Sequence, residues 1–124
     1  MPWANSDVLD NGLNHIKANA VKVALVKAYS PGDSLATVNG NVIAEAAVGS
    51  GDFTLSSVGA NRRLTFGGKT SSATQTVAAG NDLYFVFTSA SGVLWATDET
   101  TNMAVTKDNP ITFPSLQYNS GQPT

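Results

Sequence analysis

Hydrophobic and polar positions along the chain follow two different periods. Four apolar side chains near the start recur at intervals of three or four residues: Leu9, Leu13, Ile16 and Ala20. Side chains at this spacing lie on one face of a helix, so the pattern predicts a short helix over residues 6–20. Ser6 suits the capping position at its start, because its hydroxyl can accept a hydrogen bond from a free N–H group of the first turn.

From residue 21 onward the pattern is that of short strands separated by turn residues. Eight segments alternate or are rich in β-branched and aromatic residues: 21–28, 42–48, 53–56, 62–66, 69–78, 83–87, 93–97 and 111–118. The segments 83–87 and 93–97 flank a short Ser- and Gly-containing loop and predict a hairpin. The Thr- and Ser-rich segment 69–78 is expected at an exposed edge, and Pro114 predicts an edge position or a bend in the last strand. Two polar segments predict turns: 30–33 and 39–41.

This succession of strands predicts a mainly β fold: an antiparallel β-sandwich or jelly-roll-like barrel with one short N-terminal helix. A chain of 124 residues suits a single domain around one core, and no linker or internal repeat divides it. Before the helix, residues 1–5 are expected to form an N-terminal arm. Residues 119–124 are polar and contain Gly and Pro, which predicts a loose C-terminal tail.

The surface is expected to be poor in charge. Charged residues make up 13% of the chain, about half of the roughly 25% found in typical soluble domains. Weak electrostatic repulsion between molecules favours a protein that works inside an assembly, although Thr also suits the outward faces of any small β-domain. The net charge is −2 and the seven basic residues are scattered, so we expect no binding to nucleic acid, which requires several phosphate contacts.

Other features of the sequence exclude further classes. Cysteine is absent, which rules out disulfides and thiolate metal sites. The longest apolar stretch, 83–87, is far too short for a membrane span. The N-terminus lacks the basic region and apolar run of a signal peptide, so the protein is expected to be made in a cytoplasm.

Residues suited to catalysis do not form a recognisable set. His15 is the one histidine, and it lies off the apolar face of the predicted helix with no carboxylate positioned to orient it. Four acidic residues lie near predicted strand ends, and their spacing selects no glycosidase-like pair: Asp82, Asp98, Glu99 and Asp108. Gly68-Lys69-Thr70 resembles the end of a phosphate-binding loop, but Arg63 stands where the first glycine of that motif belongs. We therefore predict no enzyme activity, no cofactor and no metal site.

The aromatic residues divide into two kinds. Phe85, Phe87 and Trp95 lie on the predicted hairpin and are expected in the core, because large aromatic side chains bury extensive apolar area. Trp3 precedes the helix on the N-terminal arm. Such an anchor either packs back onto its own helix or inserts into a pocket of a partner, and both readings remain open.

Two groups of segments together resemble a known family. They are residues 6–13, Ile16-Lys17 and 21–28 at the beginning, and 82–87, 93–98 and 111–114 toward the end. In their order and packing pattern they are similar to the capsid cement, or head decoration, proteins of short-tailed phages, which have jelly-roll-like β folds. The similarity covers both ends of the chain and leaves out residues 29–78.

The resemblance implies a structural protein of the virion. Such a protein binds the major capsid protein on the outer capsid surface, bridges neighbouring subunits against internal DNA pressure, and forms a homo-oligomer, with a dimer favoured. Contacts with the partner would come from both ends of the chain. The candidate partner-binding residues are Met1, Pro2, Trp3, Tyr118, Gln122 and Pro123.

A second function class stays open from the sequence. The domain would then belong to a phage tail or fibre and recognise a host-surface glycan. That reading requires an exposed aromatic platform outside the core, for which the candidates are Tyr29, Tyr84 and Tyr118.

Overall fold

The computed structural model describes residues 3, 5–101 and 103–122. Its elements, in chain order, are α1 (Ser6–Asn19), β1 (Lys22–Val26), α2 (Leu35–Gly40), β2 (Val42–Ala47), the 3-10 turn η1 (Ser50–Asp52), β3 (Phe53–Val58), β4 (Asn61–Phe66), β5 (Lys69–Ser72), β6 (Leu83–Thr88), β7 (Val93–Glu99), β8 (Pro110–Phe113) and β9 (Leu116–Ser120).

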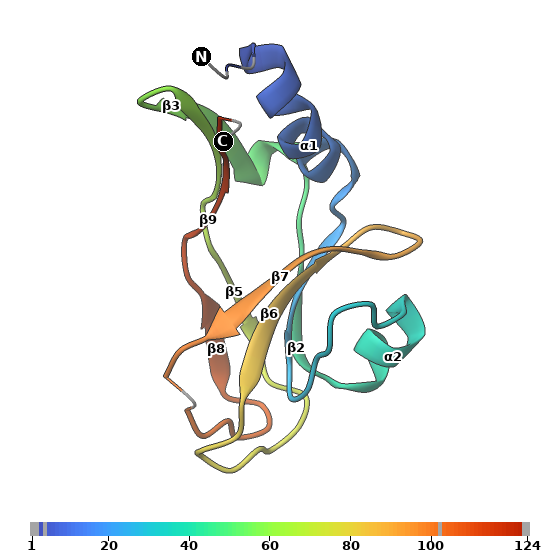
Figure 1. Cartoon of the computed structure of the whole chain (residues 1–124). Helices are drawn as coiled ribbons and strands as arrows, with labels where there is room; N and C mark the ends of the chain where they lie inside the picture. The colour runs from blue at the N-terminus through green and yellow to red at the C-terminus, as the bar shows by residue number, and fades with distance from the viewer. Residues whose placement is uncertain (1–2, 4, 102, 123–124) are drawn as a thin grey trace.

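Three antiparallel sheets build the fold (Figure 1). Sheet A has four strands in the order β2-β1-β6-β7, sheet B has the order β3-β4-β9, and sheet C pairs β5 with β8. The predicted mainly β, antiparallel, sandwich-like fold with a helix at its N-terminus is confirmed. Strand pairing among the described residues does not join the sheets into a closed barrel, so the barrel form of the prediction is not what the chain adopts.

Sheets B and C are two halves of one bent ribbon. The chain that forms β4 continues into β5, and the chain that forms β8 continues into β9, with Phe66 opposite Leu116 and Lys69 opposite Phe113. The ladder is interrupted by Gly67-Gly68 between β4 and β5 and by Pro114 between β8 and β9. The predicted bend at Pro114 is therefore confirmed, since proline cannot donate to a ladder.

Aromatic side chains from all three sheets fill the centre of the molecule. The ring centroids of Phe53, Phe66 and Phe87 lie 5.1–5.8 Å apart, and Trp95 stacks on Phe87 at 4.6 Å with an interplanar angle of 8°. Helix α1 adds its apolar face to the same cluster: Leu13, Ile16 and Ala20. The core positions predicted for the hairpin aromatics are confirmed.

A second, smaller cluster lies on the other face of sheet A. It joins α2 to the sheet through Val38, Ala24, Val26 and Val86. The sequence predicted a turn at 39–41, but these residues form the end and cap of α2 instead. A helix of six residues is shorter than two turns and leaves almost no periodic signal. Its start is fixed by Ser34, whose Oγ accepts a hydrogen bond from the Thr37 N–H at 3.2 Å.

Two predicted boundaries differ from the observed ones. Strand β5 ends at Ser72. In the rest of the predicted edge strand 69–78, the Thr74 N–H donates to the Ile43 carbonyl of β2 at 2.7 Å, and Val77 forms an antiparallel bridge with Val105. The predicted loose tail 119–124 begins inside β9, since Asn119 and Ser120 pair with β4. In both cases a neighbouring strand supplies partners that the local sequence does not reveal.

Candidate functional site

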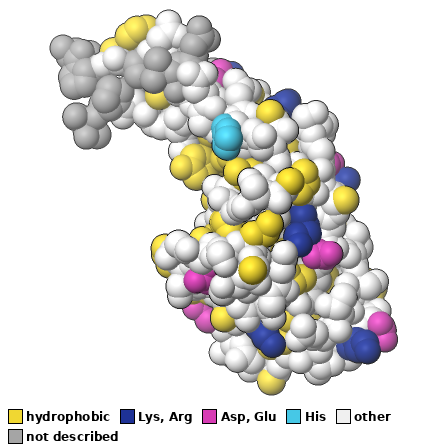
Figure 2. Space-filling model, turned by 90° about the vertical axis from the view of Figure 1, so that its right-hand side faces the viewer, with side chains coloured by type: hydrophobic (Ala, Val, Ile, Leu, Met, Phe, Trp, Pro, Cys, Tyr) yellow, Lys and Arg dark blue, Asp and Glu magenta, His cyan; other side chains and the backbone are white. Residues whose placement is uncertain are grey.

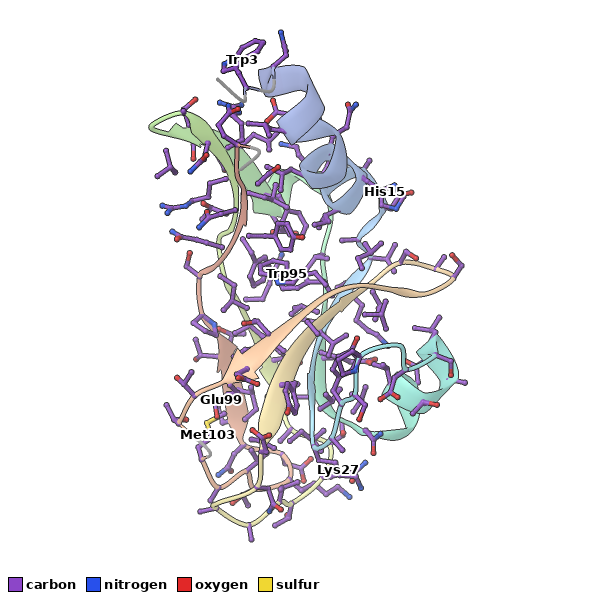
Figure 3. All side chains as sticks on the ribbon, viewed as in Figure 1. Trp3, His15, Lys27, Trp95, Glu99 and Met103 are labelled. Carbon is purple, nitrogen blue, oxygen red and sulfur yellow. The ribbon has the colours of Figure 1, made fainter. Side chains whose placement is uncertain are left out.

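Segments from the two ends of the chain meet at one end of the molecule. Together with the β3–β4 turn they line a hollow of about 230 Å³, the terminal hollow: Trp3, Asn5, Ser57, Gly59, Ala60, Asn61, Arg62 and Gln122. The Trp3 side chain projects beside the start of α1, away from the central Trp95 (Figure 3). It is 69% exposed, an unusual position for a side chain whose burial is so favourable.

Hydrogen bonds and an ion pair fix the walls of the terminal hollow. The backbone N–H of Gln122 donates to Asn61 Oδ1 at 2.9 Å, and Gln122 Nε2 donates to the Ala60 carbonyl at 2.8 Å. Arg62 Nε donates to Asp10 Oδ1 at 2.7 Å, and both side chains of this pair are mostly buried. The pair ties α1 to β4. The walls of the hollow come from three separate parts of the chain: the segment before α1, the region of the β3–β4 turn, and Gln122.

The structure brings together some of the predicted partner-binding residues. Trp3 and Gln122 line the same hollow. Tyr118 does not, because it lies on β9 with its ring 5.5 Å from that of Trp95. Met1, Pro2 and Pro123 lie outside the described residues, so their role stays a prediction.

A second surface follows β7, the edge strand of sheet A, and reaches Tyr118 on β9 of sheet B. Two adjoining hollows of about 460 and 420 Å³ share Tyr29, Pro31 and Ala96 in their walls. We call the pair the tyrosine groove; its lining includes Tyr29, Tyr84, Trp95, Tyr118, Asp33 and Asp98. Of the three tyrosines suggested by the sequence as an aromatic platform, Tyr29 and Tyr84 line one hollow, and Tyr29 and Tyr118 line the other.

The aromatic rings of the tyrosine groove are held in place by their neighbours. The ring centroids of Tyr29 and Tyr84 lie 5.9 Å apart, with an interplanar angle of 56°. The rings of Tyr118 and Trp95 make an interplanar angle of 78°. The Tyr84 hydroxyl donates to Asp82 Oδ2 at 2.7 Å. This hydrogen bond raises the pKa of Tyr84, so the phenol stays protonated.

The turn at residues 30–33, predicted from Pro31 and Gly32, closes one side of the groove. The Asp33 N–H donates to the Ser30 carbonyl at 3.0 Å, and the Ser30 N–H donates to Asp33 Oδ2 at 2.9 Å. These two bonds form a compact loop that holds Tyr29 over the outer face of sheet A. The strands β6 and β7 beneath it supply Tyr84 and Asp98.

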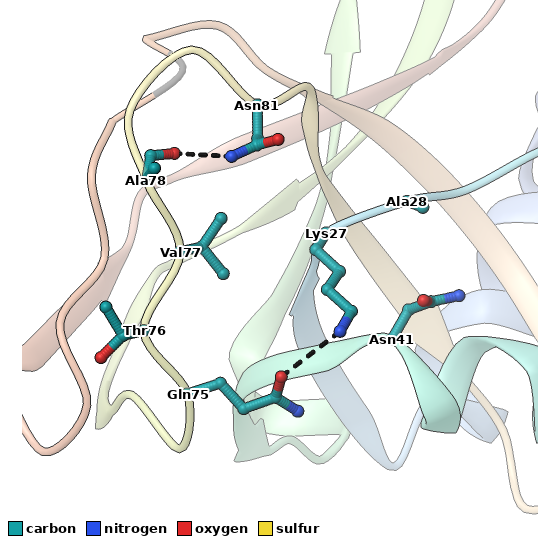
Figure 4. A pocket seen from close by; sticks show the side chains of 8 residues that line it. All are labelled: Lys27, Ala28, Asn41, Gln75, Thr76, Val77, Ala78 and Asn81. Carbon is teal, nitrogen blue, oxygen red and sulfur yellow. Dashed lines mark hydrogen bonds between the residues drawn. The ribbon is translucent and has the colours of Figure 1, made fainter.

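A third hollow, of about 470 Å³, is lined mainly by amide, hydroxyl and backbone groups (Figure 4). Lys27 Nζ donates to Gln75 Oε1 at 3.4 Å across it, and Asn81 Nδ2 donates to the Ala78 carbonyl at 2.8 Å. Its lining contains no carboxylate and no aromatic ring among the described residues. Its described lining therefore offers no aromatic surface for stacking.

The titratable residues are dispersed. His15 is exposed, as its place off the apolar face of the helix predicted (Figure 2). Asn19 Nδ2, on the next turn of α1, lies 3.4 Å from His15 Nδ1 and donates to the His15 carbonyl at 2.8 Å. Glu99 is only 6% exposed; its Oε1 accepts bonds from the Thr101 N–H and hydroxyl, and its Oε2 has no partner among the described residues. Asp98 points to the opposite face of β7. The described part of the chain holds no group of three or more residues able to ligate a metal.

The phosphate-loop resemblance at Gly68-Lys69-Thr70 has a structural explanation. Gly68 lies in the break of the bent ribbon with a φ of +93°, and Lys69 pairs with Asp52 at 3.0 Å. The segment leads into a strand, not a helix, so it lacks the helix N-terminus that such loops use to bind phosphate.

No described helix is long and apolar enough to cross a membrane.

Comparisons with protein-family models, with curated protein sequences and with solved structures gave no match for this chain.

Proposed function

We propose that this chain is a structural virion protein that decorates and cements a phage capsid, binding the major capsid protein through the terminal hollow. The observation that carries the proposal is the exposed indole of Trp3 at the edge of that hollow. Tryptophan is enriched among the few residues that supply most of the binding energy of protein interfaces. An indole left in water gains this energy only when a partner covers it.

The chemistry of the hollow supports contact with a protein surface. Its walls are amides, backbone and small side chains, and among the described residues that line it only Arg62 is charged. Asp10 neutralises that charge within the chain. Recognition here would then depend on apolar contact and neutral hydrogen bonds, which salt screens very little.

The remainder of the surface is compatible with a place in an assembly. Its charged side chains are few, and on the face shown in Figure 2 most of them lie next to a side chain of opposite sign. Copies of such a protein repel each other weakly, which favours close packing on a capsid. We propose a homo-oligomer, with a dimer favoured, and the two ends of the chain as its contacts with neighbours.

The proposal is tested by co-sedimentation of the purified protein with heads assembled from the corresponding major capsid protein. Trp3→Ala is expected to reduce capsid occupancy at least tenfold, because a central interface tryptophan commonly contributes about 2 kcal/mol or more. The thermal midpoint should not change, since the indole makes little contact within the chain. Removal of residues 1–5 should have the same effect as Trp3→Ala.

The matched control is Val21→Ala, which truncates another exposed apolar side chain (48% exposed) away from the terminal hollow. Capsid occupancy of this variant should equal that of the parent protein. For both proteins, occupancy should be nearly constant between low and moderate salt. Full occupancy of the Trp3→Ala protein, or sedimentation with phage tails in place of heads, would refute the proposal.

A further inference from the structure

The tyrosine groove is not explained by capsid binding through the terminal hollow. It follows the edge strand β7 and shares no lining residue with the terminal hollow. We propose that the tyrosine groove binds a neutral oligosaccharide. This goes beyond capsid decoration and does not depend on it.

The first support is the arrangement of rings. Tyr29, Tyr84 and Tyr118 are each partly exposed, and Tyr118 is 42% exposed. The face of an aromatic ring carries partial negative charge and attracts the weakly positive C–H groups on the face of a pyranose. Tyr29 and Tyr84 pack on each other at an interplanar angle of 56° and line one hollow, and Tyr118 lines the adjoining hollow.

The second support is charge. Asp33 and Asp98 line the groove, and no Lys or Arg is among its described lining residues. A carboxylate accepts strong hydrogen bonds from sugar hydroxyls, whereas it repels sulfate, phosphate and carboxylate groups. The groove therefore selects a neutral sugar over an acidic one.

The third support is size and rigidity. Each hollow falls within the range of roughly 300–1,000 Å³ that is usual for small-ligand sites. The two adjoin through Tyr29, Pro31 and Ala96, so a ligand with more than one ring can occupy both. The strands and the hydrogen-bonded turn around Asp33 hold the walls in place before binding, which lowers the entropic cost of association.

A proline-rich peptide is the competing occupant, because such peptides also dock in aromatic grooves. Its backbone offers chiefly carbonyl groups, which need hydrogen-bond donors from the protein. When ionised, the carboxylates of Asp33 and Asp98 accept hydrogen bonds and cannot donate them. A sugar supplies the many donors that these acceptors require, so we favour the sugar.

The test titrates the intact protein with maltohexaose and chitohexaose as neutral probes, an oligogalacturonate as the acidic probe, and a proline decapeptide. Binding is followed by calorimetry and by amide chemical shifts. At least one neutral probe should bind and shift amides of β6, β7 and the 30–33 turn, while the acidic probe should bind at least tenfold more weakly. Tyr118→Ala and Tyr29→Ala should each weaken neutral binding about tenfold or more.

Tyr29 also packs on the small cluster of sheet A, so Tyr29→Ala removes packing in the fold as well as a contact with the ligand. A second variant that leaves the fold intact is therefore needed. Asp98→Asn serves this purpose because the side chain is exposed; together with Asp33→Asn it should reduce the discrimination against the acidic probe. Trp3→Ala should bind the neutral probe as the parent does.

The inference is overturned if neither neutral probe binds, if the proline decapeptide binds in their place, or if the parent binds the acidic probe equally well. The capsid assay uses Trp3 and the terminal hollow alone, so failure of either proposal leaves the other standing.

Discussion

Gly68 is the residue on which the bent ribbon most directly depends. Its φ is +93°, and a Cβ at this position would lie 2.9 Å from the Phe113 carbonyl oxygen. Gly68→Ala is therefore expected to lower the free energy of unfolding by about 2–4 kcal/mol, because backbone strain adds to a contact with backbone that cannot easily move. Urea denaturation followed by circular dichroism measures the change.

Gly80 supplies a matched control. Its φ is +90°, almost the same, but no atom lies within 4 Å of a Cβ there. Gly80→Ala should cost only about 1 kcal/mol, the strain alone. If the two variants lost equal stability, the close approach of Gly68 to the backbone of Phe113 would not be the reason for glycine at position 68.

Single residues were predictable where one local signal decided their place. The aromatic hairpin residues Phe87 and Trp95 were expected in the core and are found there. Glu99 was treated only as one of several dispersed acids, yet it is almost fully buried. Its strand alternates so that it shares a face with Trp95, but its side-chain type gave no reason to expect burial. Hydrogen bonds from Thr101 accommodate one of its oxygens.

At the scale of elements, η1 and the start of β5 are joined through one carboxylate. Asp52 Oδ2 accepts the Gly49 N–H at 2.8 Å, and Asp52 Oδ1 pairs with Lys69 Nζ at 3.0 Å. The hydrogen bond from Gly49 lowers the pKa of Asp52, and Lys69 lowers it further. The folded state therefore prefers the ionised carboxylate more than the unfolded state does.

The sign of the pH dependence follows from that preference. Asp52 contributes its full stabilisation above its ordinary pKa of 3.8, and the contribution is lost as the pH falls through the lowered folded value. Asp52→Asn should cost about 1 kcal/mol near neutral pH, and the difference from the parent should shrink as the pH falls below 3.8 and through the lowered folded pKa. Urea denaturation at several pH values measures it.

Lys69→Met provides the comparison for that prediction. It removes the ion pair but keeps the hydrogen bond from Gly49, which is the larger influence on Asp52. It should therefore destabilise the protein less than Asp52→Asn does. A loss that stayed constant down to the lowest pH would contradict the assigned role of the Asp52 charge.

Elements were predictable where their pattern was local. Helix α1, strands β1 to β4 and the β6–β7 hairpin correspond to predicted segments, because alternation or helical spacing marks each of them. Helix α2 was missed since it is shorter than two turns. The split of segment 69–78 and the pairing of residues 119–120 were missed because β2 and β4, distant in sequence, provide their hydrogen bonds.

At the scale of the whole molecule, one apolar cluster contains residues of α1 and of all three sheets. Phe87 lies at its centre, in contact with Phe53, Phe66 and Trp95. Phe87→Ala should lower the free energy of unfolding by about 3–5 kcal/mol. Since the cluster connects every layer, helix and sheets should still unfold in one transition.

Coincident near- and far-ultraviolet dichroism during thermal unfolding checks this expectation. The near-ultraviolet signal reports the Phe87–Trp95 stack, and the far-ultraviolet signal reports the backbone. Two separated transitions in the parent protein would show that α1 or sheet A unfolds independently of the rest.

The binding surfaces were only partly predictable. The sequence identified Trp3, Gln122 and the three tyrosines as residue types suited to contact, and it placed Tyr118 both with the chain ends and in the aromatic platform. The fold places Tyr118 across from Trp95. Which side chains share a surface depends on strand order, and strand order follows from pairings between distant segments.

The bent ribbon has a mechanical consequence. The same two lengths of backbone serve sheet B and sheet C, so the two sheets are linked covalently twice as well as through packed side chains. A pull exerted on the last strand would be transmitted along peptide bonds into β8 and onward to the opposite pole, bypassing the apolar interior. A molecule fastened at one pole could in this way resist traction without first losing its interior packing.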